Sequence, residues 1–387
     1  MNKFFVNLGA FLLAVVLALS LFWFNKDRVL EQYPSLLSLQ TATKTDIHKL
    51  AISDLETGKI VIFGSSELRY TKLKFIPQNY FNLDLQLPLT VNGDQGHQCF
   101  SILSQLAAYS NEKVNKNARV VIFLSPGWVS PRNANGTVIT EFLKYMNSSM
   151  MYQLYFKSNI DDYYKRLIGQ YIHKNINKIT DISFIYKYAS NYPNNSDMSK
   201  VDHYFIKKIV QIISSQQSTA KKIIYTLPNL NYNALREEAK EVAELSDNNQ
   251  FGITNKKYKK HVEPGIKKGN FPFKLAKPPI IGKNQEYKDF LNLLKLLKRY
   301  KIKPLFVMLD IHPYIYSKNR DSMKPILTAI KQEIINNDYG YMDMWTYDKS
   351  KYKIGKLLDP WHIGELGWVE VNKKIIEHFM AGGLHDK

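Results

Sequence analysis

The chain has 387 residues, of which 45% are apolar and 13% aromatic. These values exclude a disordered chain and predict a globular protein with a sizeable core. Lys and Arg number 53 against 34 Asp and Glu, so the formal net charge is +19. Such an excess fits either general solubility or an anionic partner, and charge alone does not distinguish the two.

The first part of the chain predicts a membrane anchor. Residues 4–24 include no charged side chain, and about 20 apolar residues span the hydrocarbon core of a bilayer. A cleaved secretory signal needs a small-residue cleavage site, and Ala18-Leu19-Ser20 is a poor one. We therefore expect an uncleaved N-terminal transmembrane helix within residues 1–30 and one domain over residues 31–387. The flanking charges do not set the orientation of the anchor.

Short apolar runs bounded by Gly or Pro predict strands that are buried on both faces. They cover residues 59–63, 119–124, 222–227, 304–309 and 341–345. Helical spacing over residues 285–300 and a last helix over 366–379 accompany them. This alternation predicts an α/β three-layer sandwich with a mostly parallel sheet.

Two stretches do not fit the alternation. Residues 133–215 are rich in Tyr, Asn and Lys and predict a helical insertion, with helices over 160–174 and 201–214. The insertion is interpreted either as a lid or partner surface, or as ordinary helices packed on the sheet. Residues 248–269 are polar and basic, which is typical of a surface loop.

Ser66 follows the first predicted strand, after Gly64-Ser65. Ligands of open α/β sheets bind at the carboxyl edge of the strands, so the hydroxyl of Ser66 is a candidate nucleophile. A following helix N-terminus would direct backbone N–H groups to the same place. The alternative is that Ser65 or Ser66 only caps that helix, with Glu67 in its first turn.

Asp359 and His362 lie three residues apart, just before the last predicted helix. In a short turn the aspartate can orient the imidazole while Nε2 faces outward, which is what a serine nucleophile needs. Asp310 and His312 form a rival pair after the fourth strand, and His97 is a rival base. No third ligand stands at metal spacing near Asp359 and His362, so we expect no metal, and nothing in the sequence indicates a cofactor.

An oxyanion formed at Ser66 needs further donors. Gly96 and Gln98 lie in a glycine-containing turn before a helix, and Gly127 and Trp128 close the second strand. We expect these four residues to line the oxyanion or substrate site. Cys99 is the only cysteine, which excludes an internal disulfide, and we interpret it as a small buried side chain rather than a nucleophile.

These pieces together resemble the SGNH (GDSL-type) hydrolases, with Gly64-Ser65-Ser66 in the place of that family's Gly-Asp-Ser. Within that superfamily the chain resembles the DltD family, the D-alanyl transfer proteins of teichoic acid D-alanylation. The resemblance runs over essentially the whole chain. It rests on the anchor and on five motifs: Phe63-Gly64-Ser65-Ser66-Glu67-Leu68, Ser125-Pro126-Gly127-Trp128, Asn248-Asn249-Gln250-Phe251-Gly252-Ile253, Glu286-Tyr287-Lys288-Asp289, and Asp359-Pro360-Trp361-His362-Ile363-Gly364 with Gly367-Trp368.

The resemblance implies a membrane-anchored domain on the extracytoplasmic face, working with a membrane-bound O-acyltransferase. It also implies a D-alanyl ester on a serine that is passed to an anionic glycerol-phosphate polymer such as lipoteichoic acid. The chain departs from the superfamily at Gly127, which stands near a position where these enzymes often have an asparagine donor. Only a backbone N–H is available there.

We therefore expect a serine acyltransferase in which Ser66 attacks, His362 is the base and Asp359 orients it. A surface ester hydrolase or deacetylase with the same triad is the first alternative, with water as acceptor. A non-catalytic docking partner of the O-acyltransferase is the second. A nucleic-acid binder is the last, because no basic helix stands out and neither the anchor nor the triad would serve it.

Overall fold

The computed structural model describes residues 47–180, 183–192, 222–226, 228–269, 277–315 and 320–380. The predicted anchor and the predicted helix over residues 201–214 lie outside these ranges. Within them, every helix is too short or too polar to cross a membrane.

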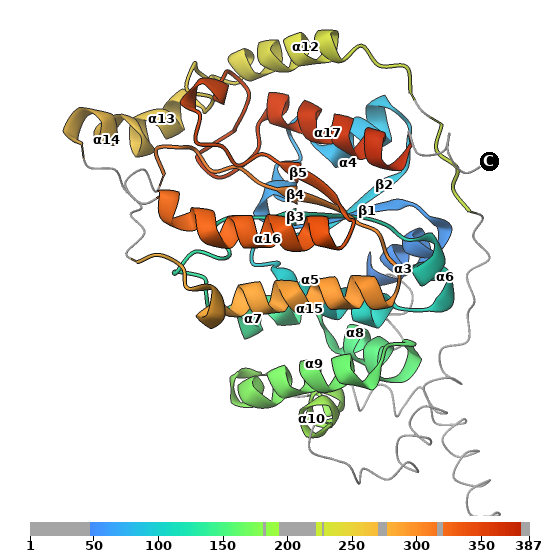
Figure 1. Ribbon diagram of the computed structural model, residues 1–387. Helices are drawn as coiled ribbons and strands as arrows, with labels where there is room; N and C mark the ends of the chain where they lie inside the picture. Colours follow the sequence, from blue (N-terminus) through green and yellow to red (C-terminus); the bar gives the residue numbers. More distant parts are fainter. Residues whose placement is uncertain are drawn as a thin grey trace, which may run out of the picture.

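The centre of the described chain is a parallel sheet of five strands in the order β2-β1-β3-β4-β5 (Figure 1). In register, Ile60 lies opposite Leu89 and Arg119, and Val121 lies opposite Leu305. The strands are β1 Ile60–Gly64, β2 Leu89–Gly93, β3 Arg119–Leu124, β4 Leu305–Met308 and β5 Gly340–Asp343. Four of them, β1, β3, β4 and β5, match predicted strands, and each end lies within two residues of the predicted end.

Alternate residues of β1, β3, β4 and β5 belong to two separate cores, as the pleat of a strand requires. Ile60 and Ile62 face one core, and Val61 and Phe63 face the other. The core that contains Ile60 and Ile62 is covered by α4 Pro77–Asn79, α12 Tyr232–Leu245 and α17 Glu365–Phe379 (Figure 1). The core that contains Val61 and Phe63 is covered by α3 Ile47–Thr57, α5 Cys99–Tyr109, α6 Glu112–Asn117, α15 Gln285–Arg299 and α16 Lys324–Asn336. The predicted three-layer α/β sandwich is confirmed.

Most of the described part of the predicted helical insertion is helical, with turns or irregular segments at residues 133–138 and 158–161. Phe142, Tyr155 and Ile168 are fully buried in the same core as α5, so these helices extend the helical layer beneath α5 and α15 (Figure 1). Whether the insertion also serves as a lid or partner surface stays a prediction. The helices are α7 Ile139–Tyr145, α8 Ser148–Tyr152, α9 Asp162–Asn175 and α10 Phe184–Asn191.

Three predictions need correction. Strand β2 was not predicted, because its partly exposed Leu-Thr-Val-Asn-Gly sequence is not a continuous apolar run. Residues 222–226 form no strand; the N–H of Ile223 donates to Thr57 O, and Ile224 is exposed. The predicted surface loop over residues 248–269 contains α13 Asn255–His261 and α14 Glu263–Lys268 instead.

Candidate active site

Ser66 lies at the carboxyl end of β1. This strand is buried along its length and ends at Gly64, where a Cβ would overlap Glu67 Oε1 and lie 2.9 Å from Leu68 Cδ1. Glycine therefore allows the sharp turn after which Ser66 begins the 3-10 helix Ser66–Arg69. With the strand order 2-1-3-4-5, the crevice of the sheet opens at the carboxyl ends of β1 and β3. Ser66 stands at this crevice.

Neither serine caps the helix through its side chain. Ser65 Oγ instead donates to Asp94 O at 3.2 Å, and Ser66 Oγ lies 2.9 Å from His362 Nε2. The capping alternative is therefore wrong. The expectation of a helix dipole behind Ser66 also needs correction, because the helix has only four residues and its dipole is small.

His362 connects Ser66 to Asp359. Its Nδ1 lies 2.8 Å from Asp359 Oδ1 and 2.9 Å from Oδ2. Asp359 also accepts the backbone N–H groups of Trp361 at 2.9 Å and of His362 at 3.1 Å, so the carboxylate organises the turn that presents the ring. The three side chains form one continuous chain of hydrogen bonds from hydroxyl to carboxylate.

The surroundings of Asp359 define the proton positions. Burial favours the neutral acid, but the hydrogen bond from His362 and the backbone N–H of Trp361 outweigh it and hold the pKa of Asp359 below its ordinary value. An ionised carboxylate only accepts, so Nδ1 of His362 carries the proton. In the neutral ring, Nε2 then has a lone pair that faces the hydroxyl of Ser66. This is the protonation state that a general base needs.

The turn that contains Asp359 and His362 is held by a second segment. Leu357 pairs with Ile363 across the turn, and the N–H of Leu358 donates to His362 O at 2.8 Å. Asn248 Nδ2 donates to Leu357 O at 2.7 Å, and the N–H of Leu357 donates to Gly252 O at 2.8 Å. Residues 248–252, which follow α12, therefore support the position of the imidazole from behind.

Sequence reasoning missed Tyr70. Its ring lies 4.8 Å from that of His362, and its hydroxyl is 3.2 Å from His362 Nδ1 and 3.5 Å from Asp359 Oδ2. Burial and the charge of Asp359 raise the pKa of Tyr70 to about 12, so the phenol stays protonated and donates to the carboxylate. Its position four residues after Ser66, in the turn ending the 3-10 helix, is the only signal that could have indicated it.

The loop that contains Gly96 is attached to the Ser66 turn. Arg69 forms an ion pair with Asp94 at 2.9 Å, and Asp94 O also accepts the hydroxyl of Ser65. Gly96 has φ +81°, and a Cβ there would overlap the carboxylate of Glu141 on α7. The structure thus brings the Gly96 loop to the same edge as Ser66, as expected.

The other three expected lining residues differ in their surroundings. Gln98 is mostly buried, and its carbonyl accepts the N–H of Ile102 at the start of α5. The N–H of Gly127 donates to Ser125 Oγ at 3.2 Å, so it already has a partner. Trp128 is only 8% exposed and packs in the core beneath the sheet. Its ring belongs to that core rather than to a wall of the crevice.

The two other candidate side chains, His97 and Cys99, are both buried in the structure. His97 is fully buried, stacks on Tyr145 with ring centroids 3.8 Å apart, and contacts Gly64 O through Nδ1 at 2.9 Å. Cys99 is buried, and burial raises the pKa of its thiol well above the ordinary value. The small buried role expected for Cys99 fits these surroundings.

Asp310 and His312 belong to two different networks. Asp310 accepts from Tyr352 Oη at 2.6 Å and forms a buried ion pair with Arg320 at 3.3 Å. His312 Nε2 contacts Phe251 O at 2.9 Å. The residues that the structure describes contain no group of three His, Cys, Asp or Glu side chains arranged to hold a metal ion.

The fold and the hydrogen-bonded side chains define an α/β sandwich that presents serine, histidine and aspartate in contact at the switch point of its sheet. The chain belongs to the DltD family: the family model described as "DltD protein" matches residues 36–380. It is similar to "Protein DltD" of Bacillus subtilis (strain 168), with 25% identity over 344 residues that cover 83% of this chain and 82% of that protein. The resemblance to this family is confirmed, and membership links the chain to the D-alanylation of teichoic acid.

Proposed function

We propose that the chain is a serine acyltransferase that moves D-alanyl groups to an anionic cell-surface polymer such as lipoteichoic acid. The observation that carries the proposal is the 2.9 Å contact between Ser66 Oγ and His362 Nε2, with Nδ1 of the same ring held by Asp359. A serine hydroxyl is a poor nucleophile at neutral pH unless a base removes its proton. Family membership supports the choice of D-alanine and of a teichoic acid.

In the first step, Ser66 Oγ attacks the carbonyl carbon of the acyl donor while His362 Nε2 takes the hydroxyl proton. The bond between the carbonyl carbon and the donor's leaving atom then breaks, and His362 returns the proton to that atom. The product is a D-alanyl ester on Ser66. Asp359 stabilises the imidazolium that exists between the two proton transfers.

In the second step, a hydroxyl of the polymer takes the place of Ser66 as nucleophile. His362 removes its proton, the new ester bond forms, and the proton returns to Ser66 Oγ as the acyl–serine bond breaks. Both steps pass through a tetrahedral oxyanion, for which backbone N–H groups around Ser66 and Gly96 are the candidate donors. Gln98, Gly127 and Trp128 are not assigned a contact with the substrate.

The cellular setting is part of the same proposal. The apolar residues 4–24 anchor the chain in the cell membrane, and the catalytic domain lies on the extracytoplasmic face. A membrane-bound O-acyltransferase is the proposed partner that delivers the acyl group. The formal net charge of +19 suits a polyanionic acceptor and gives long-range attraction to it.

Ester hydrolysis is the second candidate function. Ser66 and Tyr70 are half-buried, and the side chain of His362 is 17% exposed, so water can reach the reacting atoms. Competition between water and a polymer hydroxyl for the acyl-enzyme separates the two activities. A docking protein without catalysis is the third, and it predicts that Ser66→Ala leaves polymer acylation in cells intact.

The first test is the intact mass of the full-length chain in an uncharged detergent after exposure to a fluorophosphonate. One adduct that maps to Ser66 is expected, because only an activated serine reacts at an appreciable rate. Ser66→Ala removes the nucleophile, and Ser65→Ala is the matched control, since it deletes the neighbouring hydroxyl and leaves the triad contacts in place. An adduct on Ser66 that persists at full rate in His362→Ala would contradict the proposed mechanism.

A further inference from the structure

His312 lies directly behind the turn that carries Asp359 and His362. It follows shortly after the end of β4 and is only 1% exposed. Its backbone N–H donates to Pro360 O at 2.8 Å. Pro360 stands between Asp359 and His362 in the chain, so the segment that leaves the carboxyl end of β4 is hydrogen-bonded to the turn itself.

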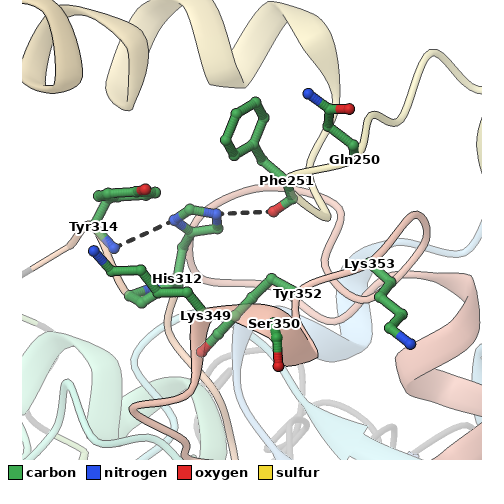
Figure 2. A pocket seen from close by; sticks show the side chains of 9 residues that line it. Gln250, Phe251, His312, Tyr314, Lys349, Ser350, Tyr352 and Lys353 are labelled. Atoms are coloured by element: carbon green, nitrogen blue, oxygen red, sulfur yellow. Dashed lines mark hydrogen bonds between the residues drawn. The ribbon is translucent and has the colours of Figure 1, made fainter.

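The imidazole of His312 contacts the segment that supports the same turn. Its Nε2–H donates to Phe251 O at 2.9 Å (Figure 2). The next residue, Gly252, accepts the N–H of Leu357 at 2.8 Å, and Leu357 pairs with Ile363 across the turn. The backbone and the ring of one residue thus close a circuit of hydrogen bonds around the turn.

The ring of His312 has one orientation and one tautomer. Its Nδ1 accepts from the N–H of Tyr314 at 3.4 Å (Figure 2), so the proton of the neutral ring is on Nε2 and faces Phe251 O. Burial lowers the pKa of His312 to about 4, and the charges of Arg320 and Lys349 act in the same direction. The ring is therefore neutral at physiological pH. Both of its nitrogens contact backbone groups rather than the reacting atoms.

Asp310 fixes the segment from which His312 projects. Its carboxylate accepts the hydroxyl of Tyr352 at 2.6 Å and forms a buried ion pair with Arg320 at 3.3 Å. Arg320 and Tyr352 also donate to the carbonyl of Ile311, at 2.8 and 3.2 Å. The two networks of Asp310 and His312 therefore meet at Ile311, the residue between them. His312 thus contacts the turn from a base that is itself held by buried polar contacts.

The position of His362 depends on support of this kind. The 2.9 Å contact between Ser66 Oγ and His362 Nε2 joins the residue that follows β1 to a turn that lies outside any helix or strand. Proton transfer requires these two atoms to stay within hydrogen-bond reach, and a displacement of about 1 Å can lower a rate about 100-fold.

We propose that His312 is a positioning residue, which sets the distance between His362 Nε2 and Ser66 Oγ. Its ring acts through the segment 248–252 and does not touch the substrate. A histidine with a structural role alone would change stability and leave the reactivity of the folded protein unaltered. The inference rests on the proposed function, because it gives His312 a part in the same proton transfer.

The test measures fluorophosphonate labelling of Ser66 in the full-length chain in uncharged detergent. During labelling, Ser66 Oγ bonds to phosphorus, fluoride leaves, and the hydroxyl proton passes to His362. Varying the reagent concentration separates the reversible binding constant from the maximal rate. His312→Leu removes the donor to Phe251 O, so the maximal rate is expected to fall about 10- to 100-fold while reagent binding stays within about twofold. His312→Gln places an amide nitrogen near the position of Nε2, and it is expected to restore the rate to within about threefold.

The matched control is His378→Leu. His378 is a partly buried histidine that packs against Gly340 at the amino end of β5, on the opposite edge of the sheet from Ser66. This variant is expected to keep the maximal rate, whatever stability it loses. Thermal unfolding midpoints show whether each labelled variant is folded.

An unchanged maximal rate in folded His312→Leu would overturn the inference. So would a His312→Gln variant that is as slow as His312→Leu, because the bond to Phe251 O would then not be the cause.

If the His312 variants do not fold, Asn248→Asp takes their place. This change lies at a partly exposed position and removes the 2.7 Å hydrogen bond to Leu357 O, which is the next link to the turn. A maximal rate lowered by about threefold or more would support the inference, and an unchanged rate would overturn it. No adduct on Ser66 in the unaltered chain would overturn the proposed function and this inference together. An adduct that forms equally fast with and without the His312 ring would remove this inference alone.

Discussion

Asp359→Asn tests whether the carboxylate sets the proton positions of the triad. Asp359 Oδ1 accepts the N–H groups of Trp361 and His362 at 2.9 and 3.1 Å, so the amide oxygen of asparagine takes that place. The amide nitrogen then occupies the position of Oδ2, 2.9 Å from Nδ1 of His362, and donates to it. Nδ1 becomes the acceptor, the ring proton moves to Nε2, and that proton faces Ser66 Oγ. His362 therefore no longer acts as a general base, although asparagine has the same shape as the aspartate it replaces.

The expected loss is large because the wrong tautomer cannot accept the serine proton. In serine hydrolases with such a triad this exchange lowers the rate about 10⁴-fold, or about 5 kcal/mol in activation free energy. The assay is the pseudo-first-order rate of fluorophosphonate labelling of Ser66 between pH 6 and 9. Asp338→Asn, at an exposed position, is the control, and the thermal unfolding midpoint of both variants shows whether the fold is kept. A loss below tenfold in a folded Asp359→Asn variant would refute the reasoning.

Three further changes probe the surroundings of the site. Tyr70→Phe keeps the ring but removes a long hydrogen bond to Asp359, so a labelling rate reduced by about two- to tenfold is expected, and an unchanged rate would show that the hydroxyl is dispensable. Gly64→Ala introduces a Cβ that overlaps the Glu67 carboxylate, and it should lower the free energy of unfolding by about 1–3 kcal/mol in urea titrations; unchanged stability would contradict the close approach. Burial and a neighbouring carboxylate raise the pKa of Glu286 from 4.5 to about 8, so this group makes stability fall as the pH rises from about 4.5 to about 8, because the unfolded carboxyl ionises first. Glu286→Gln should flatten that part of the stability–pH curve measured by thermal unfolding, and an unaltered slope would exclude the effect.

The sequence predicted the layers of the fold because buried parallel strands leave a strong local signal. Runs such as the one ending at Gly64 are continuous and apolar, and the helix at Gln285–Arg299 has regular spacing. Strand β2 leaves no such signal, since four of its five residues are partly exposed at the edge of the sheet. The predicted strand over residues 222–227 shows the opposite error, because the described residues 222–226 are partly or fully exposed although their sequence resembles a buried strand.

The candidate site was predictable where the chemistry lies within one short motif. Asp359 and His362 are three residues apart, and their turn needs nothing from the rest of the chain to be recognised. In the structure His362 contacts Ser66 at 2.9 Å, whereas the catalytic role of the three residues stays a prediction. Tyr70 and the support from Asn248 could not be predicted, because both depend on how distant segments meet in the folded chain.

The contact between Ser66 and His362 joins residues that are 296 positions apart in the chain. At synthesis rates of about 5–20 residues per second, the serine emerges about 15–60 s before its histidine. Throughout that interval the hydroxyl is an ordinary alcohol that cannot attack an ester or an activated acyl group. A chain that ends before Asp359 lacks both partners of the serine and is inert in the same way. On the proposed mechanism, Ser66 therefore becomes reactive only at the end of biosynthesis, when the turn with Asp359 and His362 has folded against it, and no acylating fragment precedes the folded protein.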